Sequence, residues 1–261
     1  MDLKPMTRKE FFLQKIIDNT AMGGVTINNQ DKTITENGTY TADEGFTGLG
    51  TVTVDVQSGG DEASVLDSLI DRSITEVSSN VERIGVSAFW ECKSLITADF
   101  PLATIIGASA FDYCSQLATV NFPLATEIGN FSFRYCLQIT KVCFPLATKI
   151  GNNAFDHDSQ LTTADFTLVK SIGSEAFRYS NITALILRNE TMATISNKSA
   201  FNVTPIANGT GHIYVPKALM ESYQSATNWA TYATQFRAIE DYSVDGTVTG
   251  ELDWAKIEAA A

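Results

Sequence analysis

The sequence predicts a solenoid in which short coils of chain stack side by side, and three observations support this fold class. The dipeptide Ile-Gly recurs with a step of 22 residues. A phenylalanine follows each of these isoleucines by five residues. A coil this short cannot bury its apolar side alone, so stacked neighbours must form the core. The Ile-Gly pairs begin at Ile84, Ile106, Ile128, Ile150 and Ile172, and the phenylalanines are Phe89, Phe111, Phe133, Phe155 and Phe177.

Each coil is expected to begin with a β-strand. Apolar and polar positions alternate at the end of residues 117–122, which is the period of a strand. Pro123 ends that strand because proline has no amide hydrogen for the next ladder bond. We then expect an extended piece to Ile128, a bend at Gly129 and a tight helical turn around Phe133.

One repeat unit reads roughly LxxAxFPLATxIGxxAFxxCxx and resembles the BspA-like bacterial class of leucine-rich repeat, with its IGxxAFxxC signature. The resemblance covers about residues 74–204. It implies a right-handed leucine-rich-repeat solenoid with a parallel β-sheet along one side and short helical turns. The copies decay at both ends of this range, as capping repeats do.

Two segments are expected before the solenoid. Residues 1–22 group their apolar side chains as an amphipathic N-terminal helix does. Residues 23–58 alternate like strands around a turn signal at Asn37-Gly38, which predicts a small β module. Residues 59–73 are predicted to be a polar linker.

These flanks carry a second resemblance. Residues 34–56, ITENGTYTADEGFTGLGTVTVDV, resemble a segment of tail-associated proteins from phages and prophages of Gram-positive bacteria. Residues 4–16, KPMTRKEFFLQKI, look like the start of such proteins. The resemblance implies a place in a virion tail, with the N-terminal module contacting other virion tail proteins.

Residues 205–242 resemble the C-terminal cap that closes many BspA-like arrays. A strand at 212–215 leads through Pro216 into helical stretches that we expect to cover the apolar end of the last coil. The second stretch carries Trp229, Tyr232, Phe236 and Ile239. Residues 243–261 are expected to form a peripheral tail.

The composition argues against two classes of partner. The chain has 30 Asp plus Glu against 18 Lys plus Arg, a formal net charge of -12, so nucleic acid and anionic membrane surfaces are disfavoured. No apolar run approaches the roughly 20 residues that cross a bilayer, and no signal peptide is recognisable. We therefore expect a folded protein that does not insert into membranes.

The cysteines predict buried thiols and not a metal site. Cys92, Cys114 and Cys136 share one column of the repeat, and none belongs to a CxxC pair. Cys143 lies on the outward phase of its strand and is expected to be an exposed free thiol.

Residues that carry chemistry are sparse. His157 and His212 are the two histidines and lie far apart in the repeat plan, so no Ser/His/Asp or metal cluster can be assembled. We expect no enzymatic activity, no cofactor and no metal.

Two neighbouring columns lie on the closing turn, and the aromatic one is the first place to look for a ligand. One alternates in charge after its first residue and predicts a ladder of exposed ion pairs, each worth about 0–1 kcal/mol. The next is aromatic, and its rings either stack on one another or stack on sugar rings. The charged column is Trp90, Asp112, Arg134, Asp156 and Arg178, and the aromatic column follows Glu91 with Tyr113, Tyr135, His157 and Tyr179. The candidate ligand face is Trp90, Tyr113, Tyr135, His157 and Tyr179, and the second candidate is the polar strand face, Thr97, Asp99, Thr119, Asn121, Lys141, Thr163 and Asp165.

Three non-enzymatic functions remain open. The leading interpretation is a phage or prophage tail-associated protein, located in the virion, whose repeats bind a host cell-surface protein or carbohydrate. The second is a BspA-like adhesin on a bacterial cell surface, weakened by the lack of a visible signal peptide or wall-sorting motif. The third is an intracellular repeat scaffold or effector that binds a host protein. Solenoids serve all three, so the fold does not decide among them.

Overall fold

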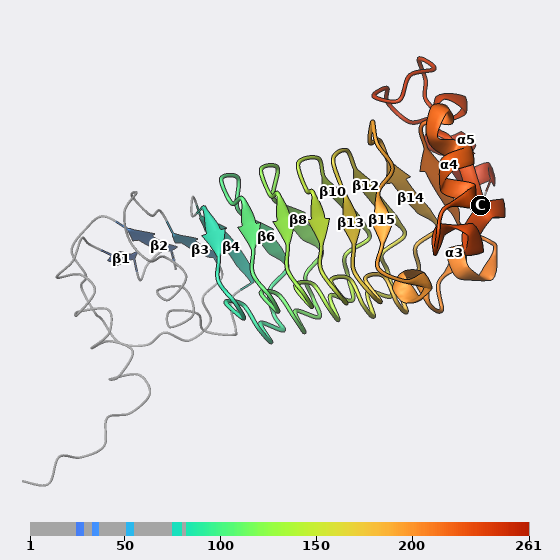
Figure 1. The fold of residues 1–261 in the computed structure, drawn as a ribbon. Helices are drawn as coiled ribbons and strands as arrows, with labels where there is room; N and C mark the ends of the chain where they lie inside the picture. The colour runs from blue at the N-terminus through green and yellow to red at the C-terminus, as the bar shows by residue number, and fades with distance from the viewer. Residues whose placement is uncertain (1–24, 29–32, 37–50, 55–74, 80–81, 261) are drawn as a thin grey trace, which may run out of the picture.

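The computed structural model describes residues 25–28, 33–36, 51–54, 75–79 and 82–260. Over this part the chain winds into coils stacked along one axis, and helices close the C-terminal end (Figure 1). The predicted solenoid of parallel strands is therefore confirmed. The predicted N-terminal helix (1–22) and linker (59–73) lie outside the described residues.

One side of the coils carries the longer strands, which pair in parallel and in register, as Thr97 does with Thr119. The sequence predicted one sheet along this side, but the ladder is interrupted after the fourth strand and two sheets result. The first sheet contains β3 (Thr51–Val54), β4 (Glu76–Ser79), β6 (Thr97–Asp99) and β8 (Thr119–Asn121). The second contains β10 (Lys141–Phe144), β12 (Thr163–Phe166), β14 (Ala184–Leu187), β16 (His212–Val215) and β17 (Phe236–Ala238).

A third sheet, made of two-residue strands, runs along another side without interruption. It pairs Ile106 with Ile128 and Ile128 with Ile150, so it joins the coils where the longer strands do not pair. Its strands are β5 (Arg83–Ile84), β7 (Ile105–Ile106), β9 (Glu127–Ile128), β11 (Lys149–Ile150), β13 (Ser171–Ile172) and β15 (Thr194–Ile195).

The glycine after each isoleucine is required by close approach of adjacent coils. A Cβ on Gly129 would lie 2.6 Å from the backbone carbon of Gly107 and 2.7 Å from the nitrogen of Ala108. Real Cβ atoms do not approach backbone this closely. The sequence interpretation of Gly129 as a bend therefore misses its main role, which is to let neighbouring backbones touch.

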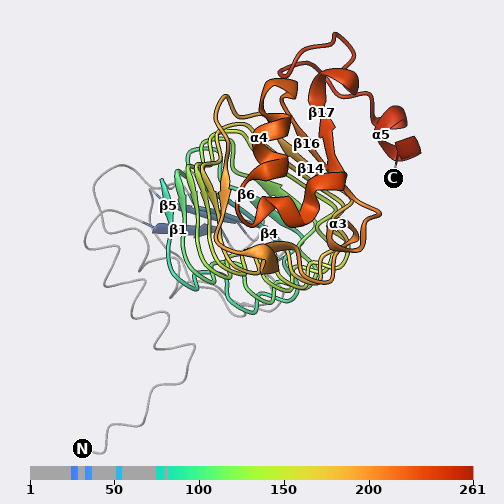
Figure 2. The ribbon, with the colours of Figure 1, turned by 45° about the vertical axis from the view of Figure 1, so that its right-hand side comes forward.

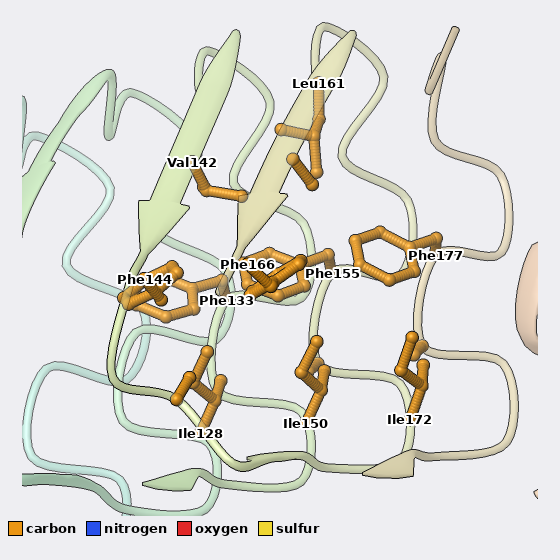
Figure 3. Close-up of a cluster of buried hydrophobic side chains, with 14 of the residues drawn as sticks. Ile128, Phe133, Val142, Phe144, Ile150, Phe155, Leu161, Phe166, Ile172 and Phe177 are labelled. Atoms are coloured by element: carbon orange, nitrogen blue, oxygen red, sulfur yellow. The ribbon is translucent and has the colours of Figure 1, made fainter. Parts of the chain in front are cut away.

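Two columns of phenylalanine rings fill the interior (Figure 3). In the column that contains Phe133, ring centroids of adjacent coils are 4.9–5.6 Å apart. In the column that contains Phe144, the distances are 5.4–6.3 Å. An isoleucine column with Ile128, Ile150 and Ile172 lies below them in the figure. The repeated phenylalanines and isoleucines thus form the core, as predicted.

Strands β1, β2 and β3 lie within residues 23–58, the segment predicted to be a small β module. β1 (Val25–Asn28) and β2 (Thr33–Glu36) form an antiparallel pair. β3 pairs in parallel with β4 and so extends the solenoid sheet into the segment predicted as a separate module. The predicted turn at Asn37-Gly38 lies outside the described residues.

The C-terminal cap covers the last coil, as expected (Figure 2). The indole Nε1 of Trp229 donates to the Ala193 carbonyl at 2.8 Å, and the Ala193 N–H donates to the Tyr223 hydroxyl at 2.8 Å. Phe236, predicted in a helix, lies in strand β17 because it extends the sheet beside β16. The remaining elements are η1 (Lys198–Phe201), α3 (Pro205–Asn208), η2 (Lys217–Leu219), α4 (Met220–Ser225), η3 (Trp229–Gln235) and η4 (Ile239–Asp241).

The C-terminal tail is not peripheral. It carries α5 (Trp254–Ala260) and buries Leu252 and Ile257 in a second apolar cluster with Ala184 and Ile186 of β14. β14 is buried on both faces, so its outward side chains need a covering layer. The apolar run ALIL at 184–187 is the sequence signal for this layer.

Candidate ligand-binding surface

The candidate ligand face lies on the run of turns that closes each coil. In the coil that begins at Gly107, the N–H groups of Ser109, Phe111 and Tyr113 donate to carbonyls of the next coil at 2.7–2.8 Å. The intervening N–H groups donate within the coil, three residues back, at 3.1–3.3 Å. The expected helical turn is therefore a series of turns bonded alternately to itself and to its neighbour.

The aromatic column occupies the left-handed region of backbone space. Tyr113, Tyr135, His157 and Tyr179 have φ between 56° and 66°, and Glu91 at the head of the column has 57°. This conformation costs an ordinary residue about 1–2 kcal/mol relative to the right-handed region. Contacts made by these side chains must offset that cost.

The aromatic rings stack on one another. Ring centroids are 4.6 Å apart for Tyr113 and Tyr135 and 4.4 Å for Tyr135 and His157, and both pairs are stacked. His157 and Tyr179 are 4.5 Å apart and are tilted by 37°. Stacked aromatic pairs contribute about 0.5–1.5 kcal/mol beyond their buried area. The column is thus one continuous aromatic ladder, and of the two sequence interpretations mutual stacking is confirmed.

Mutual stacking limits how the ladder meets a ligand. The faces of the interior rings, Tyr135 and His157, are each covered by a ring on both sides. A sugar ring therefore has no face to stack on in the middle of the ladder. Interior contacts are restricted to ring edges, which present phenol hydroxyl and imidazole nitrogen atoms.

Two ion pairs flank the ladder. Arg134 donates to both carboxylate oxygens of Asp112 at 2.9 and 2.8 Å, and Arg178 does the same to Asp156 at 3.1 and 2.8 Å. Each hydrogen-bonded carboxylate raises the pKa of its arginine partner. The sequence predicted a continuous ladder of exposed pairs. Among the described residues of this column there are instead two separate pairs, and their aspartates are buried, at 2% and 1% exposed.

Asp156 is the centre of a wider polar network. It accepts hydrogen bonds from Asn153 at 3.2 Å and from Arg178, and its Oδ1 lies 2.8 Å from Nδ1 of His157. Arg178 also reaches Glu175 at 3.0 Å. The network holds the His157 ring in place within the ladder.

Arg134 ties the ion pairs to the aromatic rings. Its guanidinium carbon lies 5.2 Å from the Tyr113 ring centroid, 5.7 Å from that of Tyr135 and 4.8 Å from that of Phe131. These distances are in the range of cation–π attraction. Phe131 was not singled out in the sequence, although it is the only aromatic residue in its column of the five Ile-Gly repeats.

Trp90 stands apart from the ladder. It belongs to the column of Asp112 and Arg134, and Glu91 occupies the ladder position in its coil. The Trp90 side chain is partly exposed. The structure therefore brings four of the five predicted ligand-face residues into one stack.

The polar strand face divides into two parts. Near its N-terminal end, Asn121 donates to Asp99 at 2.7 Å, beside the paired Thr97 and Thr119. Near its C-terminal end, the C-terminal tail covers the strands. Lys141 Nζ lies 4.2 Å from the Trp254 ring centroid.

An arginine anchors the tail on this face. Arg188 donates to Asp165 at 3.0 Å and also to the carbonyls of Val248 and Gly250, at 2.5 and 3.1 Å. Lys141 and Asp165 thus make contacts within the molecule, while Thr163 pairs with Lys141 along the strands. The tail reduces the part of the strand face that a partner could reach.

The predicted burial of Cys92, Cys114 and Cys136 and the predicted exposure of Cys143 are confirmed. The thiols of Cys114 and Cys136 donate to the carbonyls of Phe89 and Phe111, and burial raises the pKa of both. Cys143 is exposed and free, and partial burial of its sulfur, together with nearby Asp165, raises its pKa. A raised pKa leaves little thiolate near neutral pH, so this thiol is a weak nucleophile.

An apolar ridge was missed in the sequence. Each longer strand from β6 to β12 is followed by an exposed leucine, and these leucines lie one per coil. Their exposed fractions are 36–45%, although they share the repeat period of the buried phenylalanines. The proline before three of them is the signal of an outward-facing turn. The ridge is Leu102, Leu124, Leu146 and Leu168.

Across the residues the structure describes, no group of three or more His, Cys, Asp or Glu side chains is placed to hold a metal ion. In the same residues, no helix has the length and apolar character needed to cross a bilayer.

Residues 82–207 match, in six copies, the family model described as BspA type leucine rich repeat region. The fold is thus a leucine-rich-repeat solenoid, and its repeats are similar to those of the BspA type. The match includes the coils that carry the aromatic ladder, both ion pairs and the leucine ridge. A comparison with curated proteins gave no significant match.

Proposed function

We propose that the BspA-type repeats are a non-enzymatic binding module whose aromatic ladder meets a host cell-surface protein or carbohydrate. The observation that supports this most is the ladder itself, in which four partly exposed rings are held in the left-handed backbone region over consecutive coils. Tyrosine edges combine apolar surface with a hydroxyl and are common in recognition surfaces.

The proposed setting is the tail of a phage or prophage virion. Its support is the resemblance of residues 34–56 and 4–16 to tail-associated proteins of Gram-positive phages. In this setting the N-terminal module contacts other virion proteins and the solenoid points its ladder at the host. A BspA-like adhesin on a bacterial surface would use the same ladder and is the second candidate, because the repeats are similar to that type.

A cell-labelling assay tests the binding role. Fluorescently labelled full-length protein is mixed with a panel of intact Gram-positive strains, and the variant Tyr113→Ser/Tyr135→Ser/Tyr179→Ser is compared with wild type. We expect a subset of strains to be labelled by wild type and not by the triple variant. Circular dichroism and thermal melting establish whether the triple variant is folded.

The matched control changes the other candidate face. The variant Thr119→Ala/Asn121→Ala alters exposed strand-face residues that the tail does not cover. It is expected to label cells as wild type does. Labelling lost in this control and kept in the triple variant would move the binding role to the strand face, and no labelling of any strain would reject the cell-surface role.

A further inference from the structure

The aromatic ladder ends in a step beyond Tyr179. The N–H of Tyr135 donates to the Asp156 carbonyl, and the next residue, His157, is the neighbouring ring. In the same way the N–H of Tyr179 donates to the Asn202 carbonyl at 3.0 Å, which makes Val203 the next side chain of the column. Val203 has the same left-handed φ, 56°. An isopropyl group therefore follows where a fifth ring would complete the stack.

Adjacent ring planes of the ladder become less parallel toward this step. The angle between adjacent ring planes rises from 13° to 23° to 37° along the column. Tyr179 is 46% exposed and Val203 is 54% exposed, more than the interior rings. Among the described residues, no aromatic ring stacks on the far side of Tyr179. Tyr179 therefore offers a ring face that the interior rings do not.

The surroundings of the step are polar, and the charged groups beside it are paired with one another. Asn181 and Asn202, in the two coils that meet there, are exposed amides. The guanidinium carbon of Arg178 lies 5.5 Å from the Tyr179 ring centroid, and this arginine is paired with Asp156 at 2.8 Å and with Glu175 at 3.0 Å. An exposed amide can donate and accept hydrogen bonds and carries no charge.

We propose that the step formed by Tyr179 and Val203 is a subsite for a neutral pyranose ring. One face of a pyranose is lined by C–H groups and fits an aromatic ring, while its edge carries hydroxyls that suit the two asparagine amides. The net charge of -12 disfavours polyanionic glycans. The inference rests on the proposed binding role of the ladder and names its ligand class and its point of stacking.

Saturation-transfer NMR on the full-length protein tests the subsite. The probes are three neutral oligosaccharides, cellotetraose, maltotetraose and the tetramer of N-acetylglucosamine, each titrated into wild type. We expect saturation to reach the C–H protons of at least one probe. We expect Tyr179→Ala to weaken that binding about five- to tenfold, the worth of one stacked ring.

A second variant removes the step and keeps Tyr179. Val203→Tyr introduces a side chain that the column already accepts at this φ, and it places a fifth ring on the Tyr179 face. We expect a loss similar to that of Tyr179→Ala, whereas Thr119→Ala on the strand face is expected to bind as wild type. No transfer to any of the three probes, or transfer unchanged by both Tyr179→Ala and Val203→Tyr, overturns the proposal.

The cell-labelling assay separates this proposal from the general function. Labelling that needs the ladder but survives both Tyr179→Ala and Val203→Tyr would keep the binding role and reject the subsite. Oligosaccharide binding that both variants weaken, in a protein that labels no cell, would keep the subsite and reject the cell-surface role.

Discussion

Phe133 and Leu124 are both apolar residues of the repeat, but they are expected to contribute differently to the free energy of unfolding. Phe133 is fully buried between phenylalanines of two neighbouring coils, whereas Leu124 lies on the exposed ridge. We expect Phe133→Ala to lower the free energy of unfolding by about 3–5 kcal/mol, because it leaves a cavity that neighbouring coils share. Leu124→Ala is expected to change it by about 0.5 kcal/mol or less. Urea denaturation measures both, and equal effects would contradict the assigned core.

Asp158 is a buried acid in a column of cysteines. Burial raises its pKa well above the usual range, and the nearby charges of Asp156 and Asp112 raise it further, while a hydrogen bond from the Cys136 N–H acts in the opposite direction. Its Oδ1 accepts that bond at 2.9 Å, and its Oδ2 makes no hydrogen bond to any described residue. The folded protein therefore favours the protonated carboxyl.

This pKa predicts that Asp158 makes stability fall as pH rises. The folded-state pKa lies above the unfolded one, so the stabilising contribution is complete below the unfolded pKa, near 4, and is lost as pH rises toward the folded pKa. Asp158→Ser removes the acid and introduces the residue that Ser180 already is in this column. We expect the variant to gain stability over wild type as pH increases from 4 to 8. Thermal melts across this range test it, and a constant or shrinking difference would show that the carboxyl is not the cause.

At the scale of single residues, the repeat register was enough to predict the core and the ladder. Column membership alone placed Phe133 inside and the Tyr135 ring between its neighbours. Exposure within a column was harder to predict, because Asp112 and Leu124 both break the rule that charged residues are outside and leucines inside. Their positions depend on the turn geometry, which the period does not describe.

Among the strands and helices, those with a local sequence signal were predicted, whereas features that depend on distant contacts were not. The strand at 212–215 was predicted with the bounds it has, since Pro216 marks its end. The interruption between β8 and β10 and the covering of β14 by the tail were not predicted. Both depend on contacts between segments that are distant in the sequence or between coils with the same sequence pattern.

The tail is expected to contribute to stability as an element. Leu252 is buried against the outer face of β14 and β16, whereas Val244, in the same tail, is exposed. We expect Leu252→Ala to cost about 2–5 kcal/mol in unfolding free energy and Val244→Ala about 0.5 kcal/mol or less. Urea denaturation of the two variants tests this, and an unchanged midpoint for Leu252→Ala would restore the view of the tail as peripheral.

Across the whole molecule, the turn runs couple the coils in one direction. The peptide unit between Ala108 and Ser109 accepts from the preceding coil through its carbonyl and donates to the following coil through its N–H. Equivalent units repeat along the solenoid, so their dipoles align with its axis as they do in a helix. Each coil is therefore stabilised mainly by its two neighbours, which is the behaviour expected of a solenoid.

The ion pairs give the solenoid a second period, twice that of the backbone. Charges alternate from Asp112 to Arg134 and from Asp156 to Arg178, while the chain repeats every 22 residues. Deleting residues 129–150 removes one coil and sets Asp112 beside Asp156, so two buried carboxylates become neighbours. Arg178, on the cap side of Asp156, is then the arginine that remains in this column. Deleting residues 129–172 removes two coils and sets Asp112 beside Arg178.

If coil number alone decided stability, the variant that loses two coils would melt lower than the variant that loses one. Leaving a buried carboxylate without its partner costs about 3–5 kcal/mol, so we expect the opposite order. Adding Asp112→Asn to the one-coil deletion removes the repulsion and is expected to raise its melting temperature above that of the two-coil deletion. Thermal denaturation followed by circular dichroism tests the three proteins. A one-coil deletion that melts higher without Asp112→Asn would mean that apolar stacking, and not charge alternation, sets which coils can be neighbours.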